Sequence, residues 1–443
     1  MKTRGGFKEV ILLAFPAVIS MISHSVMSMT DTIMVGKLGA SEIAAVGLAN
    51  VAIFTVYGLF MGIIEILETF VSQSFGSGER KKCAHMAWQG LYLSLIFGSF
   101  VLIFNPMSDW LFSIIASTDA VQTIGAAYFR VRLYGASFFL SCFAFSSFFI
   151  GTQDTKTPMK ISIVANIINI TLDYALIFGA FGLPKLGATG AGLATVLANG
   201  TSVLLYAFMF LKKQTHESYG TRIMPAFDWL EVKRIIKIGL PLGIEMFLRI
   251  ASFLIFSALI GAVGDRQLAA SQICIQIIRF SFMPGYGLAV ATTALVGKYI
   301  GAKNINAATK SVKSSLAIGA IYASALAVIL LTLAQPIVGL FNTDPTVVAI
   351  CRRIMFLAAF LQFFDIIAIV ASGALRGAGD TKWIMKATLY GSWLVGLPIA
   401  IFFCAFIKLG AFGAWIGLTS ETLFLATIFY LRFYKGKWKE IRL

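Results

Sequence analysis

The chain has 443 residues, of which 58% are hydrophobic and only 13% are charged. This composition lies far outside the balance of a soluble globular protein and indicates a polytopic membrane protein. The net charge of +16 is spread over short basic runs between apolar segments, where membrane topology explains it better than nucleic-acid binding does, so no nucleic-acid partner is expected.

The first apolar segment, residues 10–33, combines a helix breaker with a buried acid. About 24 residues at roughly 1.5 Å each exceed a hydrocarbon core of ~30 Å, which predicts a transmembrane helix. Pro16 removes a backbone donor and invites a kink, so it is a candidate conformational hinge. Asp31 places a carboxylate where unpaired ionisation costs roughly 3 kcal/mol or more. The alternative is a proline kink with an acid that merely reaches the outer interface.

Further apolar segments follow, separated by short clusters of Gly, Pro, Asn and charged residues. They lie at about residues 44–75, 84–105, 122–150, 159–181, 188–212, 234–260, 267–297, 312–336, 350–375, 384–407 and 411–433. With the first segment they predict an all-α integral membrane protein of twelve transmembrane helices. Most basic residues between segments fall on one side, so both termini are expected in the cytoplasm of a multi-pass protein of the plasma (inner) membrane.

An internal repeat organises the chain at a nearly constant offset of about 225 residues. Pro16 matches Pro241, and Gly62 matches Gly287. Because six helices separate the copies, two six-helix lobes should share an orientation and be related by a pseudo-two-fold axis along the membrane normal. The predicted parts are an amino-terminal lobe over 1–211 (helices 1–6), a cytoplasmic linker over 212–237 and a carboxyl-terminal lobe over 238–443 (helices 7–12).

Three stretches carry a family resemblance: LETFVSQSFGSG at 67–78, GTQDTKTP at 151–158 and LRGAGDTK at 375–382. They resemble the multidrug and toxic compound extrusion (MATE) transporters, and the resemblance covers nearly the whole chain. It implies export of organic, often cationic, compounds driven by inward movement of Na⁺ or H⁺, and it favours the DinF-like branch over the NorM-like branch. Related members of the wider superfamily flip lipid-linked sugars or export polysaccharides, which leaves the substrate class open.

The predicted fifth helix carries Asn169 and Asp173, which lie four residues apart and therefore on one face. Asp173 is roughly 21 Å from the inner end of its helix, in the outer half of the bilayer together with Asp31. Two carboxylates within ~5 Å of each other would share a proton or hold a Na⁺ ion among their oxygens. The resemblance implies the same coupling residues, since DinF-like members carry an acid on the first helix and an Asn and an Asp on the fifth. The alternative is an interhelical hydrogen-bond clamp.

A second-lobe site is predicted at Glu245 and Asp365. By resemblance, Asp365 stands where NorM-like members carry an acid on the tenth helix, eleven residues before Arg376. Arg249, however, stands where those members have their seventh-helix acid, and Glu245 and Arg249 at i, i+4 can simply neutralise each other. If Na⁺ is the coupling ion, the metal is expected at Asp31, Asp173 or Asp365.

Five further residues are candidates for a gate or a substrate contact. Glu65, Glu68 and Gln73 lie on the second helix, where Glu68 and Gln73 belong to a Glu-Thr-x-x-x-Gln-x-Phe-Gly pattern. His24 lies on the first helix, on the face of its acid, and could relay protons or act as a neutral hydrogen-bonding group. Met27 could line an adaptable drug cavity. Each role competes with a structural one.

No phosphate-loop, zinc-ligand or nucleophile motif is present, so the chain is expected to be no enzyme and to need no cofactor beyond its coupling ion. The predicted function is a secondary antiporter that exports organic cations in exchange for H⁺ or Na⁺ by alternating access, with small organic cations and the lipid bilayer as partners and a monomer as the working form. One alternative is a flippase or exporter of a lipid-linked or polyanionic substrate, which would use Arg249, Arg279, Arg130 or Arg132. Another is a channel or receptor.

Overall fold

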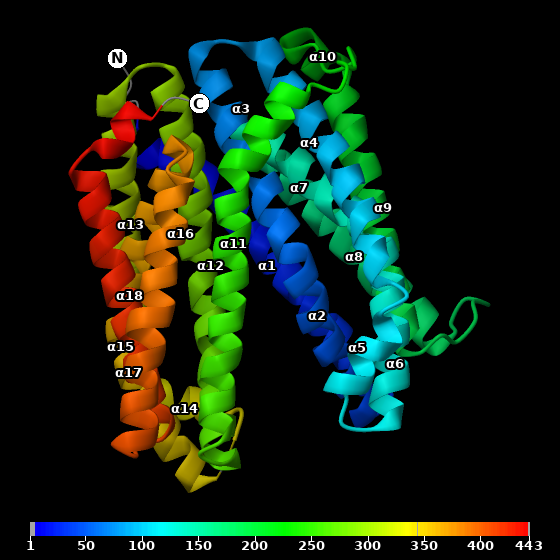
Figure 1. The fold of residues 1–443 in the computed structure, drawn as a ribbon, viewed down its shortest axis with the longest axis vertical. Helices are drawn as coiled ribbons and strands as arrows, with labels where there is room; N and C mark the ends of the chain where they lie inside the picture. The colour runs from blue at the N-terminus through cyan, green and yellow to red at the C-terminus, as the bar shows by residue number, and fades with distance from the viewer. Residues whose placement is uncertain (1–4, 343, 442–443) are drawn as a thin grey trace. The chain divides into compact units, whose positions relative to one another are not determined.

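The computed structural model describes residues 5–342 and 344–441, which form helices and loops without any strand (Figure 1). Within these residues, eleven helices are long and apolar enough to cross a membrane. A bent pair, α6 (Asp119–Tyr134) and α7 (Ala136–Gly151), makes a twelfth span when counted as one. The predicted all-α, twelve-span architecture is therefore confirmed.

The chain divides into two compact units: unit 1 comprises Met1–Val18 and Ile244–Leu443, and unit 2 comprises Ile19–Gly243. Besides α6 and α7, the helices wholly within unit 2 are α2 (Ala40–Glu65), α3 (Leu67–Ser77), α4 (Arg80–Val101), η1 (Leu102–Phe104), α5 (Ser108–Ile115), α8 (Lys156–Phe178), α9 (Ala188–Leu211) and α10 (Lys213–Tyr219). Those wholly within unit 1 are α12 (Asp265–Gly301), α13 (Ile305–Thr332), α14 (Ala334–Gly339), α15 (Pro345–Ala378), α16 (Thr381–Leu389), η2 (Tyr390–Gly396), α17 (Leu397–Ile401), η3 (Phe402–Phe406), α18 (Ala411–Tyr434) and η4 (Lys437–Glu440).

Two proline-containing helices, α1 (Phe7–Gly36) and α11 (Trp229–Gly261), belong to both units. The chain leaves unit 1 after Val18, two residues beyond Pro16, and leaves unit 2 after Gly243, two residues beyond Pro241. The unit boundaries therefore fall inside these helices. The lobe boundaries expected from the repeat lie elsewhere, and they stay a prediction.

Glycines let these half-helices pack closely on their neighbours. In unit 1 the first half of α1 lies against α12 at Gly287, where an added Cβ would meet the Val18 side chain. In unit 2 the first half of α11 lies against α2 at Gly62, where a Cβ would lie 2.5 Å from the backbone nitrogen of Gly243. Because Gly62 and Gly287 are matched positions of the repeat, each copy packs its second helix on the first half-helix of the other copy.

The start of α1 is fastened within unit 1 by polar contacts. Glu9 accepts hydrogen bonds from Lys298 Nζ at 2.7 Å and from the Tyr299 hydroxyl at 2.6 Å. The backbone nitrogen of Gly5 also donates to Glu9, at 2.7 Å, and Ser314 Oγ donates to the Gly5 carbonyl at 3.1 Å. These bonds hold the first turn of α1 against the end of α12 and the start of α13.

Three segments predicted as single helices are interrupted. The segment over 44–75 breaks at Ile66 between α2 and α3, and the segment over 122–150 bends by 48° at Gly135. The segment over 384–407 contains π-helical turns on both sides of α17, whose second residue is Pro398. Proline lacks the N–H that continues a helical hydrogen-bond ladder, so a local π turn is one way to accommodate it.

Candidate coupling site

Acidic side chains of α1 and α8 meet in unit 2. The carboxyl groups of Asp31 and Asp173 both lie beside the side-chain amide of Asn169 and interact electrostatically with each other. With its amide nitrogen turned toward them, Asn169 donates to Asp31 Oδ1 at 2.9 Å and to Asp173 Oδ2 at 3.1 Å. The structure thus brings together the three residues singled out by spacing, while their role in coupling stays a prediction.

The acid group lies on the buried face of α8. Asn169 and Asp173 are fully buried, and Asp31 is half-buried. One turn earlier on α8, Asn166 Nδ2 donates to the carbonyl of Ser23 at 2.9 Å. Amide side chains of α8 therefore hold the second half of α1 at two levels, one of them at the acids.

Arg132 of α6 adds the compensating charge. Its side chain is buried and interacts electrostatically with both Asp31 and Asp173. Two ionised carboxyl groups and one guanidinium carry one net negative charge, and a single bound proton makes the group neutral. One proton therefore decides the net charge of this site.

Two buried tyrosines hold Arg132 in place. Arg132 Nη1 donates to the Tyr128 hydroxyl at 3.0 Å, and the Tyr57 hydroxyl donates to the Arg132 carbonyl at 2.6 Å. The Tyr128 hydroxyl also lies 3.4 Å from Asn50 Oδ1, which ties α6 to α2. Sequence reasoning considered Arg132 only as a charge for a polyanionic substrate and missed both tyrosines. The one available signal was the i, i+4 spacing of Tyr128 and Arg132.

The other two candidate residues on α1 are His24 and Met27. His24 is exposed and makes no hydrogen bond or ion pair with the described parts of the chain. Met27, one turn before Asp31, is half-buried. Roles in proton relay or substrate contact remain predictions for both residues.

Glu65 and Glu68 lie at the break between α2 and α3, and Gln73 lies about two turns later on α3. Glu65 is the last residue of α2, and Glu68 lies in the first turn of α3. Glu68 is buried, whereas Glu65 and Gln73 are half-buried. Their position at an interruption of a span suits a gate and a structural role equally well.

In unit 1, Glu245 of α11 forms an ion pair with Arg249 one turn later. Glu245 is only 5% exposed, while the side chain of Arg249 is 58% exposed. Arg376 adds a second positive charge near Glu245. The structure thus shows the ion pair with Arg249, which the sequence left as one of two alternatives for Glu245.

Asp365 lies near the same arginine but is differently placed. It is 9% exposed, and its Oδ2 has no hydrogen-bond partner in residues 5–342 and 344–441. Arg249 and Glu421 both act on it electrostatically, and the Glu421 carboxylate accepts a hydrogen bond from the Ser392 hydroxyl. Glu421, which had no role assigned from sequence, is therefore a third acid of this cluster.

In the described ranges of the chain, no three His, Cys, Asp or Glu side chains gather into a group that could hold a metal ion. An alkali cation at the first site would thus depend on two carboxylates and on the carbonyl oxygen of Asn169, which faces the acids when the amide is turned over.

Comparison with known proteins places this geometry in a family. The MatE family model matches residues 16–175 and 241–402, so both matched segments begin at the prolines of the repeat. A probable multidrug resistance protein NorM of Thermotoga maritima is 30% identical over 434 residues, covering 98% of this chain and 93% of that protein. The multidrug resistance protein MdtK of Yersinia pseudotuberculosis is 29% identical over 431 residues, covering 96% and 94%.

Solved structures share the fold. An outward-facing multidrug resistance MATE family transporter of the MOP superfamily superposes with a TM-score of 0.90 at 21% identity and 99% coverage of both chains. A MOP superfamily transporter from Pyrococcus furiosus gives 0.88 at 22% identity, again with 99% coverage of both. These matches do not separate the DinF-like from the NorM-like branch. The chain belongs to the MATE family of multi-pass membrane transporters.

Proposed function

We propose that this protein is a secondary active antiporter of the plasma (inner) membrane that exports organic cations in exchange for H⁺ or Na⁺. The observation that carries the proposal is the group of Asp31, Asn169 and Asp173 facing Arg132 within the membrane-spanning helices. The names of the NorM and MdtK relatives, both multidrug resistance proteins, support a role in drug export. In this proposal the protein works as a monomer with both termini in the cytoplasm.

The exchange follows from the charge of the site. With both acids ionised, the group of Asp31, Asp173 and Arg132 carries one negative charge, which attracts a cation in a low-dielectric surrounding. Binding of one proton removes that charge, so proton and organic cation compete for the same state of the site. Competition of this kind is a coupling free energy between two ligands and drives the antiport.

The mechanical link is α1. Asp31 lies on its second half, which α8 holds in unit 2, while Glu9 fastens its first half in unit 1. A change in the charge of Asp31 alters the hydrogen bond from Asn169, and Pro16 lies where the helix can bend in response. Loading the site is thereby coupled to a rearrangement of α1.

The choice between H⁺ and Na⁺ turns on the amide of Asn169. A protonated acid pair is matched by the amide nitrogen, which donates to the remaining carboxylate oxygens, whereas Na⁺ is matched by the carbonyl oxygen. The contacts of Asn169 are satisfied when its amide nitrogen, rather than its oxygen, faces the two acids. This arrangement favours H⁺ over Na⁺ as the coupling ion.

The test is efflux of an organic cation from proteoliposomes with a proton or a sodium gradient imposed separately. Asp31→Asn and Asp173→Asn should each lower gradient-driven efflux by roughly tenfold or more, because neither variant can change charge at that position. Asp119→Asn, an exposed acid of the same unit, is the matched control. Efflux at the normal rate by both site variants would contradict the proposal.

A flippase for an anionic substrate is the weaker candidate. It needs several arginines that are free to meet the substrate, but Arg132 is buried beside two acids and Arg249 is paired with Glu245. Arg130 is paired with Asp109, which leaves only the exposed Arg279 of the four candidates. Export of a lipid-linked or polyanionic compound with no effect of organic cations would reverse this ranking.

A further inference from the structure

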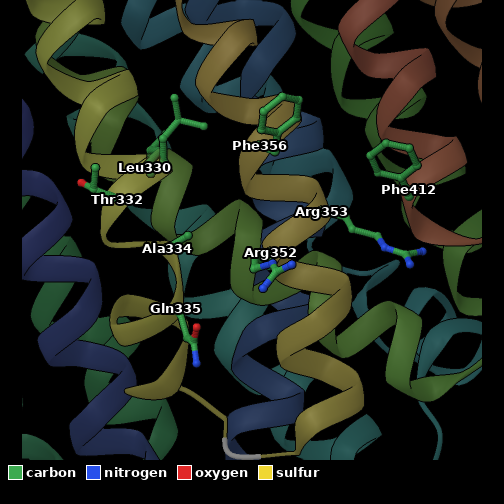
Figure 2. Close-up of a pocket in the computed structure, with 9 residues that line it drawn as sticks. Leu330, Thr332, Ala334, Gln335, Arg352, Arg353, Phe356 and Phe412 are labelled. Atoms are coloured by element: carbon green, nitrogen blue, oxygen red, sulfur yellow. The ribbon is translucent and has the colours of Figure 1, made fainter.

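Unit 1 contains a cavity of about 560 Å³ where α13 and α14 meet the start of α15 and of α18 (Figure 2). Its polar lining includes Thr332, Gln335 and the consecutive arginines Arg352 and Arg353. Its apolar lining includes Leu331 and Phe356. In Figure 2 the side chain of Arg353 extends toward α18, while that of Gln335 lies on the opposite side of α15.

The two arginines are uncompensated. Both are exposed, and neither takes part in an ion pair with the residues that the structure describes. The other arginine near the start of α15, Arg266, is paired with Asp344 at 3.3 Å. Two adjacent positive charges without a carboxylate, beside a cavity of ligand size, indicate an anionic ligand.

The depth of Arg352 and Arg353 in the membrane indicates which kind of anion they bind. Helix α15 has 34 residues. At 1.5 Å per residue it is about 51 Å long, so it extends roughly 10 Å beyond each side of a centred ~30 Å hydrocarbon core. Arg352 and Arg353 lie seven and eight residues after Pro345, about 11 Å along the axis, at the edge of the hydrocarbon core, from where their long side chains can extend to the lipid phosphates.

The apolar part of the cavity lining lies next to the arginines on the side of the membrane interior. Phe356 follows Arg352 by one helical turn toward the membrane interior and is 69% exposed, and Leu331 is 52% exposed. An arginine pair within reach of the phosphates, above exposed apolar side chains, matches a ligand with an anionic head and a hydrocarbon chain. A soluble anion would use only the polar part of this lining and make no use of Phe356 and Leu331.

We propose that this cavity binds the phosphodiester headgroup of an anionic phospholipid through Arg352 and Arg353, with an acyl chain along Phe356 and Leu331. With both termini in the cytoplasm, as proposed above, the lipid comes from the outer leaflet. That leaflet faces the side of the chain with few basic loop residues, so the arginine pair is not explained by membrane topology. The binding itself depends on neither the antiport nor the coupling ion.

The test is native mass spectrometry of the purified full-length protein titrated with phosphatidylglycerol or with phosphatidylcholine of the same acyl chains. The wild type should retain phosphatidylglycerol preferentially, and the double variant Arg352→Gln/Arg353→Gln should lose roughly tenfold or more of that preference. Arg266→Gln, which removes one positive charge from the same end of unit 1, should keep it. Millimolar inorganic phosphate should not displace the lipid.

Three results would overturn the proposal: an unchanged lipid preference in the double variant, an equal loss in Arg266→Gln, or complete displacement by inorganic phosphate, which would identify a site for a free anion. Arg352→Lys/Arg353→Lys keeps both charges and should retain most of the preference. If the double glutamine variant does not fold, the single variants Arg352→Gln and Arg353→Gln decide the matter, each with a loss of several-fold. Phe356→Ala should weaken binding of both lipids alike, because it removes only a chain contact.

Discussion

Pro16 of α1 and Pro241 of α11 occupy equivalent places in the two compact units. Pro241 follows Pro16 by 225 residues, and Ile244, the first residue after the second crossing, follows Ile19 by the same interval. Each proline thus lies two residues before the chain passes from one unit into the other. The repeat has preserved a helix breaker at the two places where one helix serves both units.

Replacing these prolines should slow transport without lowering the stability of the fold. Pro16→Ala and Pro241→Ala restore a backbone donor, and since proline inside a helix costs about 3 kcal/mol, the melting temperature should stay equal or rise. Efflux should fall because the crossing helix is stiffer. Pro158→Ala is the control, because Pro158 is the third residue of α8, where no helical hydrogen bond is lost. Full efflux in both hinge variants would remove the prolines from the mechanism.

The amide of Asn169 should matter more for coupling than that of Asn166. Asn169→Ala removes two hydrogen bonds to the acids, and Asn166→Ala removes two to Ser23, one to its backbone carbonyl and one to its hydroxyl. Hydrogen bonds to charged groups are worth about 1.5–3 kcal/mol and neutral ones about 1 kcal/mol. We therefore expect Asn169→Ala to lower gradient-driven efflux strongly and Asn166→Ala to lower mainly the melting temperature. Equal efflux from the two variants would count against a special role for Asn169.

Removing the positive charge of Arg132 should move the pH dependence of efflux. Without that guanidinium the ionised acids are less stabilised, so the efflux profile of Arg132→Gln should shift toward higher pH. The measurement is efflux against external pH in proteoliposomes. Arg130→Gln, which breaks a surface pair with Asp109, should leave the profile in place, as should the charge-conserving Arg132→Lys. An unchanged or acid-shifted profile for Arg132→Gln would contradict the assignment.

The close approach of α11 to α2 should make Gly62 intolerant of a side chain. A Cβ there would lie 2.5 Å from Gly243 N and 2.6 Å from its Cα, and backbone cannot move aside as a side chain can. Gly62→Ala should therefore cost about 1–3 kcal/mol of stability, seen as a lower melting temperature. Gly47→Ala on the same helix meets nothing within 4 Å and should be neutral or slightly stabilising.

Asp344, just ahead of α15, should contribute stability that depends on pH. A hydrogen bond from the Thr346 backbone and the neighbouring charge of Arg266 hold the pKa of Asp344 below its ordinary value of 3.8. A lowered folded-state pKa means that the contribution is present above pH 3.8 and fades as the pH falls through the lower value. Asp344→Ala should thus melt at a lower temperature than the wild type at pH 7, and the difference should shrink near pH 3. A difference independent of pH would show that the ionised carboxylate is not responsible.

Much of this fold could be predicted because it depends on local properties of the chain. Segment length and hydropathy located the spans, and the helical period placed Asn169 and Asp173 on one face of α8. Arg132 was not predicted as their partner, because which face of α6 turns toward the acids depends on packing between segments distant in sequence. The interruptions at Ile66 and Gly135 were missed for the same reason, since neither position carries a strong breaker.

The exchange of half-helices was also beyond prediction. The repeat showed Gly62 and Gly287 as equivalents, but equivalence does not reveal that each faces a segment of the other copy. That fact requires the path of the chain through space. In contrast, the competition between Glu245 and Arg249 was readable from their spacing alone, because an i, i+4 pair on a helix forms irrespective of its neighbours.

This exchange also bears on how the gene arose. A half-length ancestor folding by itself would have left the glycine surface of its second helix without the segment that covers it. Two such molecules could cover each other by trading their first half-helices, as domain-swapped homodimers do. Fusion of the duplicated gene would then have turned an intermolecular swap into a permanent internal one.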